Sequence, residues 1–180
     1  MRKFTFGPPL TIKGRKYKGL RGYAGKPFHP PLTDIPVAAY CFAAVFDVLS
    51  MAKDSGSLRA AGTYVLVGGA LVSLLAMLTG WADWHRSSQI GTQARRTINA
   101  HAVIMIAVSV LVLVDVLVRL DADGASTGLM TALSIVAATL VSVGATFGGS
   151  LVFDYGFNVE TAGDHPVWHE SEDDVFPGQH

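Results

Sequence analysis

The stretch that decides the fold is 100–118, AHAVIMIAVSVLVLVDVLV, in which Asp115 is the one charged side chain. An α-helix rises about 1.5 Å per residue, so a run of this length covers most of the roughly 30 Å of hydrocarbon in a bilayer. The run does not alternate between apolar and polar residues, and it is too long for a buried strand. It therefore predicts a helix that crosses a membrane.

Three further apolar runs of similar length occur at 33–52, 63–84 and 128–153. Half of all residues are hydrophobic and 16% are charged, against about 25% charged residues in soluble domains. A soluble helical bundle would need a polar face on every helix. The sequence therefore predicts an all-α fold, an integral membrane four-helix bundle with short loops. The chain divides into a basic tail, this membrane domain and an acidic tail, at 1–26, 27–156 and 157–180.

Lysine and arginine are distributed unevenly between the two sides of the predicted bundle. The tail 1–26 holds eight of them and no acid, and the segment between the second and third spans holds three more. The opposite side holds Lys53, Arg59 and Arg119, and the acidic C-terminal tail has no base. Because positively charged loops tend to stay inside, we expect both tails in the cytoplasm and the protein in a bacterial inner membrane.

Small residues form stripes on two of the predicted helices. Gly69, Ser73, Ala76 and Gly80 follow one face of the second span, and the fourth span carries glycines at the ends of 144–148. Helices in lipid are held together by close packing, for which small residues are suited. We interpret the stripes as helix contact faces, with a cofactor lying against the glycines as the alternative.

Two acidic side chains lie within the predicted spans, where an ionisable group is costly and usually faces the bundle interior or water. Asp115 comes four residues before Arg119, the spacing at which opposite charges meet along a helix. This spacing predicts an ion pair near the outer surface, where both aspartates would be partly wet. Asp47 has no charged neighbour on its own helix. A functional role and a structural hydrogen bond, for example with Tyr40, are both open for it.

Three histidines fall on the cytoplasmic side of the predicted topology, at His29, His85 and His101. Asp34 and Asp83 lie on the same side, and a carboxylate there could orient an imidazole. Such a set suits a metal, a haem iron, or a proton or quinone site. Histidine also occurs at membrane interfaces for structural reasons. No pair shows a metal-ligand spacing, so the sequence names no metal.

These motifs together are similar to a bacterial family of four-span membrane proteins known as domain-of-unknown-function family 2231. The resemblance covers about residues 25–160. Its carriers, in chain order, are HPPLTDIP at 29–36, FD at 46–47, LTGWADW at 78–84, NAHA at 99–102, and GGSLVF at 148–153 followed by Tyr155-Gly156.

The resemblance implies a redox context but no reaction. Members look like small redox-associated membrane proteins, and some are fused to or encoded beside Rieske-type iron–sulfur domains. This chain departs from the family pattern at two candidate ligands. Lys26-Pro27 stands where many members have a first His-Pro unit, and Ser150 stands where many have a histidine. His29, His85 and His101 are the candidate ligands that it keeps.

Our first hypothesis is a non-catalytic accessory or assembly subunit of a membrane electron-transfer complex, because the sequence carries none of the motifs of soluble-type enzymes. One alternative is a redox protein that binds haem b or a metal through the cytoplasmic-side histidines. Another is a small proton-coupled transporter that uses Asp47, Asp83, Asp115 and Arg119. We expect the lipid bilayer and protein subunits as partners, or a second copy of the chain, and not nucleic acid.

Overall fold

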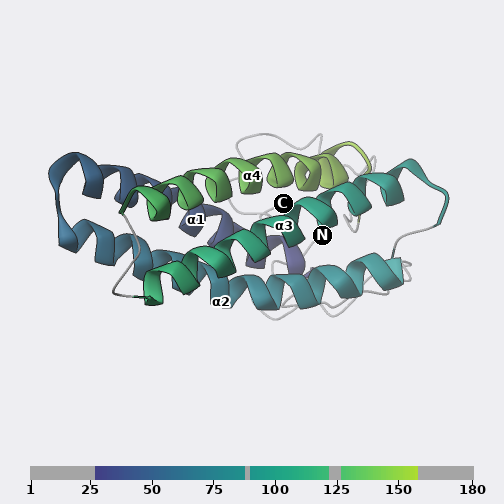
Figure 1. The fold of residues 1–180 in the computed structure, drawn as a ribbon. Helices are drawn as coiled ribbons and strands as arrows, with labels where there is room; N and C mark the ends of the chain where they lie inside the picture. The colour runs from purple at the N-terminus through teal and green to yellow at the C-terminus, as the bar shows by residue number, and fades with distance from the viewer. Residues whose placement is uncertain (1–26, 88–89, 122–126, 158–180) are drawn as a thin grey trace, which may run out of the picture.

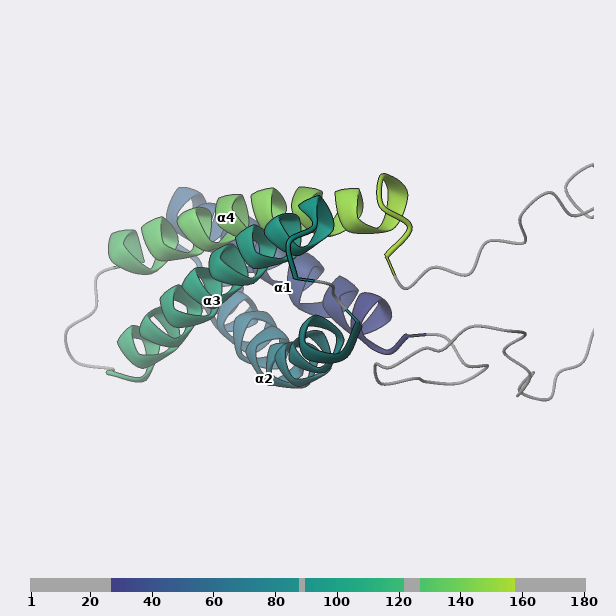
Figure 2. The same ribbon diagram turned by 90° about the vertical axis from the view of Figure 1, so that its right-hand side faces the viewer.

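Four antiparallel helices form the protein in the computed structural model, which describes residues 27–87, 90–121 and 127–157 (Figures 1 and 2). Each helix is long and apolar enough to cross a membrane. The all-α four-helix bundle predicted from the sequence is therefore confirmed. The predicted basic tail, and the acidic tail beyond residue 157, lie outside the described residues. The helices are α1 (His29–Lys53), α2 (Gly56–Ser87), α3 (Gln93–Leu120) and α4 (Thr127–Phe153).

Helix α1 begins four residues earlier than the first apolar run, which we placed at 33–52. Its N-cap is Phe28, and the carbonyl of that residue accepts a hydrogen bond from the Leu32 amide at 3.3 Å. Pro30 and Pro31 fit the first turn because the amide groups there have no partner inside the helix. The Thr33 hydroxyl donates to the carbonyl of Pro30 in the same turn at 2.7 Å.

The connection between α1 and α2 consists of two residues, Asp54 and Ser55. Asp54 has a left-handed backbone, with φ of 47°. The Ser50 hydroxyl donates to the carbonyl of Ser55 at 3.0 Å, and the Ser55 amide donates to the carbonyl of Ser50 at 3.0 Å. A turn this short makes α1 and α2 antiparallel neighbours.

The bundle is not equally tight on all sides. Helix α1 packs against α2 and α4, and α3 packs against α4, while α2 and α3 share the smallest interface. Figure 1 shows α3 crossing the bundle obliquely. Gly69 acts as a helix contact as predicted, since a Cβ there would lie 2.6 Å from the Cβ of Ala39 on α1. The buried apolar core lies midway along the helices and consists of Ala39, Tyr40, Ala43, Leu66, Val108, Val112, Ala137 and Val141.

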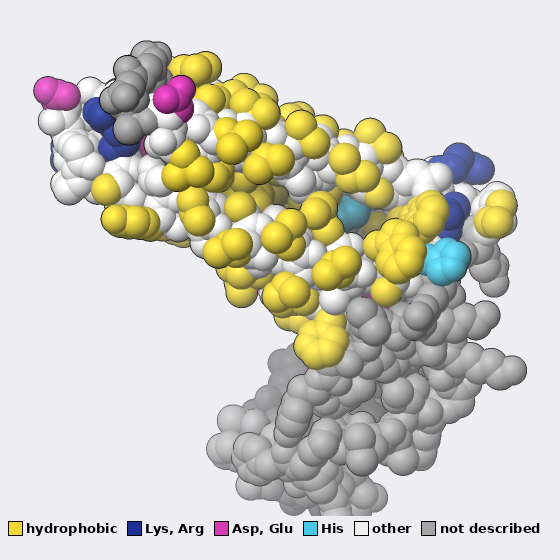
Figure 3. All heavy atoms as spheres, turned by 60° about the horizontal axis from the view of Figure 1, so that its bottom comes forward, with side chains coloured by type: hydrophobic (Ala, Val, Ile, Leu, Met, Phe, Trp, Pro, Cys, Tyr) yellow, Lys and Arg dark blue, Asp and Glu magenta, His cyan; other side chains and the backbone are white. Residues whose placement is uncertain are grey.

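The outer surface has the character of a membrane-embedded protein. Figure 3 shows hydrophobic side chains along the length of one face, with lysine, arginine and acidic side chains gathered at its two ends. Large apolar side chains on α3, such as Val103, Val110 and Leu117, are more than half exposed. Exposed apolar surface of this kind is stable when surrounded by lipid tails.

The bundle has two ends, which we call the histidine end and the aspartate end. The histidine end contains the first turns of α1 and α3 and the last turns of α2 and α4. The aspartate end contains the last turns of α1 and α3, with Asp47 and Asp115, and the first turns of α2 and α4.

Candidate functional site

Two of the three predicted histidines meet at the histidine end. His29 is the first residue of α1, and His101 lies about two turns into α3. Their ring centroids are 6.2 Å apart, and the ring planes stand at 86° to each other. We call these two side chains the histidine pair.

Each ring of the histidine pair is fixed by a backbone carbonyl of a neighbouring helix. His29 Nδ1 lies 2.9 Å from the carbonyl oxygen of Ala76 on α2, and His101 Nδ1 lies 2.8 Å from that of Gly144 on α4. A carbonyl only accepts, so we assign the hydrogen of each ring to Nδ1. In the neutral imidazole, Nε2 then keeps a free lone pair, which is the form that binds a metal ion.

Glycines make room for both rings. A Cβ on Gly80 of α2 would lie 2.6 Å from Cε1 of His29, and a Cβ on Gly148 of α4 would lie 3.3 Å from Cε1 of His101. The sequence suggested helix contact for the stripe that ends at Gly80. At this position the close neighbour is instead a histidine ring.

The remaining residues proposed for this end do not join the pair. His85 is exposed, and its ring stacks on Trp81 with centroids 5.7 Å apart and planes within 3°. Asp83 is buried, and Asp34 is exposed. We suggested that one of these aspartates orients a histidine. Nδ1 of each ring instead contacts a backbone carbonyl, and Nδ1 of His29 also lies 3.4 Å from the Thr79 hydroxyl.

A group of polar side-chain contacts joins the end of α2 to the start of α3, at the same end of the bundle as the histidine pair. The Trp84 indole donates to the Asn99 side chain at 2.8 Å. The Arg95 guanidinium lies 3.9 Å from the centroid of the Trp84 ring, and it also donates to the Trp84 carbonyl at 2.7 Å. These contacts fix the beginning of α3, and so they help to position His101.

The donor set limits what kind of metal could bind. Within the residues that the structure describes, no three His, Cys, Asp or Glu side chains lie close enough to hold a metal ion together. A zinc ion held by protein ligands needs three or four of them. Haem iron needs only its axial ligands from the protein, because the porphyrin supplies the others. The histidine pair therefore fits a haem iron, for which the porphyrin supplies most of the ligands.

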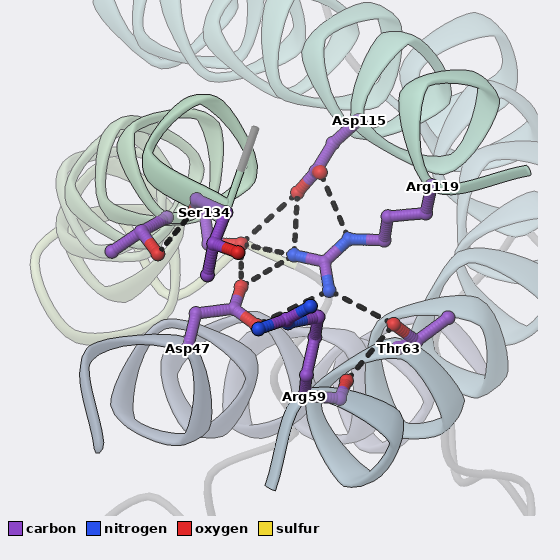
Figure 4. Close-up of polar contacts among 8 residues, drawn as sticks. Asp47, Arg59, Thr63, Asp115, Arg119 and Ser134 are labelled. Atoms are coloured by element: carbon purple, nitrogen blue, oxygen red, sulfur yellow. Dashed lines mark hydrogen bonds and ion pairs between the residues drawn. The ribbon is translucent and has the colours of Figure 1, made fainter. Parts of the chain in front are cut away.

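A second polar group lies at the aspartate end (Figure 4). Arg119 donates from Nε to Oδ1 of Asp115 at 2.9 Å, which confirms the predicted ion pair along α3. It also forms an ion pair with Asp47 of α1, with Nη1 donating to Asp47 Oδ1 at 3.2 Å. All three side chains are at most 2% exposed. We call them, with Ser134, the ionic cluster.

Every helix contributes to this region. From α4, the Ser134 oxygen lies 2.6 Å from Asp47 Oδ2, 3.0 Å from Asp115 Oδ2 and 2.7 Å from Arg119 Nη2. From α2, the Thr63 hydroxyl accepts from Arg119 Nη1 at 3.1 Å. Gly62 of α2 lets the helices approach, since a Cβ there would lie 2.7 Å from Asp47 Oδ1.

The expectations for Asp47 and Asp115 need two corrections. Both aspartates were expected to be partly wet, yet they are 1% and 0% exposed, because the four helices close around them. Asp47 was left without a charged neighbour, and its partner is Arg119 of α3. The topology put the ends of the first and third spans on one side, so this pair could have been considered. Nothing in the sequence marked Ser134 or Thr63, because isolated hydroxyl residues are common in membrane helices.

Comparison with known proteins finds a family that covers most of the chain. A family model described as "Predicted membrane protein (DUF2231)" matches residues 25–161, which include all four helices, the histidine pair and the ionic cluster. No curated protein and no solved structure matches significantly.

Proposed function

Since the chain belongs to the DUF2231 family of predicted membrane proteins, whose description names no activity, we propose a function from the geometry of its own residues. We propose that it is a membrane electron-transfer protein in which His29 and His101 would hold a haem b through their free ring nitrogens. Electron transfer is the chemistry that the haem iron would supply. The residues of the chain would bind and orient it.

The histidine pair carries this proposal. Both rings are held by Nδ1, so both Nε2 atoms are available as ligands. The ring centroids are only 6.2 Å apart, so one group bound at this end of the bundle would be within reach of both imidazoles. Cofactor sites of helical bundles are commonly built in this way, from side chains of facing helices.

The surroundings of the pair support a large apolar cofactor. The two rings come from α1 and α3, which do not pack directly against each other. Both histidines are half-buried. A ligand pocket of this type is mostly apolar, with a few polar groups that fix orientation.

The proposal changes the order of our hypotheses from the sequence. A non-catalytic accessory subunit came first there, and the histidine pair now favours a subunit with its own cofactor. We keep the proposed setting, a membrane electron-transfer complex with the histidine end at the cytoplasmic surface of a bacterial inner membrane. In this role the chain passes electrons to protein partners and transforms no substrate by itself.

The test is the visible spectrum and the haem content of the protein purified in mild detergent from haem-replete cells. We expect a Soret band and about one haem per chain, both lost in His29→Ala and in His101→Ala. His85→Ala is the matched control, because this exposed histidine lies at the same end, and it should keep the band. A wild-type protein without a Soret band would overturn the haem proposal and return the accessory subunit to first place.

A further inference from the structure

The ionic cluster has no part in the proposed function. Asp47 follows His29 by eighteen residues on the same helix, a distance of about 27 Å along its axis. The apolar core, which includes Tyr40, Val108 and Val141, lies between the cluster and the histidine pair. Any role of the cluster must therefore be argued from its own geometry.

We propose that the ionic cluster is a binding site for one proton, which is carried by Asp115 and exchanged with water at the aspartate end only. This inference is independent of the haem proposal, and either can fail alone.

The number of hydrogens on Ser134 is the first argument. Its hydroxyl oxygen lies within hydrogen-bond distance of one carboxylate oxygen of Asp47 and one of Asp115. A hydroxyl has one hydrogen, so it can donate to only one of them. The shorter contact, 2.6 Å, is to Asp47. Asp115 Oδ2 accepts from Arg119 Nη2 at 3.2 Å. Its 3.0 Å contact with the Ser134 oxygen is also favourable only if Asp115 carries a proton and donates it to that oxygen.

The balance of charge is the second argument. The fully buried part of the cluster has two carboxylates and one guanidinium, and an unbalanced charge within a membrane protein is costly. Two carboxylates that share a site do not readily ionise together. Binding one proton leaves one carboxylate for one guanidinium, and the buried charge is then balanced.

Among the described residues, Arg119 is the cation that forms ion pairs with both aspartates. Arg59 of α2, which is labelled in Figure 4, is partly buried and forms no ion pair with either of them. Its Nε atom is buried without a hydrogen-bond partner among the described residues. Residues Thr127–Phe153 of α4 include no charged side chain. The nearby Lys53, Asp54 and Asp121 are exposed.

The position of the cluster explains the exchange from one side. Asp115 lies five residues before the end of α3, and Asp47 six before the end of α1, so water is within about two helical turns. Toward the histidine end, Leu66, Val112 and Ala137 of the apolar core cannot carry a proton. The one hydroxyl of that core, on Tyr40, has no hydrogen-bond partner among the described residues. A proton that reaches the cluster therefore returns to the same surface, which differs from the transporter considered from the sequence.

Infrared spectroscopy of the full chain in lipid vesicles tests the proposal, because a protonated carboxyl has a carbonyl band that a carboxylate lacks. At neutral pH the exposed carboxyls are ionised, so we expect one such band in the wild type. The band should be lost in Asp115→Asn, and also in Asp47→Asn, where the remaining carboxylate pairs with Arg119. Asp121→Asn, an exposed aspartate just after α3, is the control and should keep the band.

Two outcomes overturn the proposal. One is a wild-type spectrum without the band, a result that does not depend on any variant folding. The other is a band that persists in either asparagine variant. The same vesicles test the sidedness: alkaline buffer should remove the band only when it is applied to the aspartate end, and removal from the histidine end would contradict exchange from one side.

Discussion

The imidazole rings of His29 and His101 stand almost perpendicular, at 86°, with centroids 6.2 Å apart. The two residues belong to α1 and α3, which are not adjacent in the chain. Each is held by a carbonyl of the helix that packs beside it. The relationship between them therefore depends on all four helices, and substitutions on any helix can test it.

Replacing Gly80 by alanine should displace His29. The new Cβ would lie 2.6 Å from Cε1 of the ring, closer than two carbon atoms can pack. We expect a loss of about 1–3 kcal/mol in stability, together with loss or a shift of the Soret band if the haem proposal holds. Thermal unfolding in detergent and visible spectra measure these effects.

Gly68 provides the matched control for this substitution. It lies on the same helix, and nothing lies within 4 Å of a Cβ built there. Gly68→Ala should leave the spectrum unchanged and raise stability by up to about 1 kcal/mol, the usual helix preference for alanine. If both variants behaved alike, the contact between Gly80 and His29 would be disproved.

Replacing Arg119 by leucine should destabilise the aspartate end severely. Asp47 and Asp115 would lose the guanidinium that bonds to both. Removing one partner of a buried ion pair costs about 3–5 kcal/mol. Arg96→Gln is the control, because that arginine is exposed and a surface change should stay within about 0.5 kcal/mol. Equal melting temperatures for the two variants would contradict the described cluster.

Replacing Ser134 by alanine is a milder test of the same cluster. The change removes a hydroxyl that contacts both aspartates and Arg119. Leaving buried polar groups without this partner should cost about 1–3 kcal/mol. Ser142→Ala, an exposed serine on the same helix, should have almost no effect on the unfolding temperature. A larger loss in Ser142→Ala than in Ser134→Ala would argue against the packing of α4.

The orientation in the membrane is testable by labelling, because the chain has a single cysteine, Cys41. In a Cys41→Ser background, Asp121→Cys should react with a membrane-impermeant thiol reagent added to intact cells. Ile90→Cys, which is 90% exposed at the histidine end, should react only after the cells are opened. The reverse pattern would show that the histidine end faces outward.

Much of the fold could be predicted from the sequence, because a membrane span has a strong local signal. The number of helices and the approximate spans follow from length and apolar character. The start of α1 could not be predicted, because Pro30 and Pro31 are equally compatible with an extended chain and with the first turn of a helix. Their placement depends on the contact of His29 with Ala76 of α2.

The sequence predicted two kinds of feature in the candidate site. One is contact between residues close together in the chain, and the other is the side of the membrane on which a residue lies. Asp115 and Arg119 are one turn apart, so their contact needs no knowledge of packing. The shared side of the three histidines followed from counting spans. The exclusion of His85 and the pairing of Asp47 with Arg119 depend on how each helix is rotated about its axis. The hydrophobic pattern does not determine that rotation, because the outer faces of these helices are apolar as well as the inner faces.

The ionic cluster has a consequence for biosynthesis. A ribosome makes Asp47 before Arg119, and Ser134 comes later still. The first hairpin therefore enters the bilayer with a carboxylate whose counter-charge has not yet been translated. A chain interrupted before the third helix would retain this unmatched acid, a feature by which quality-control proteases could distinguish an incomplete protein from a finished one.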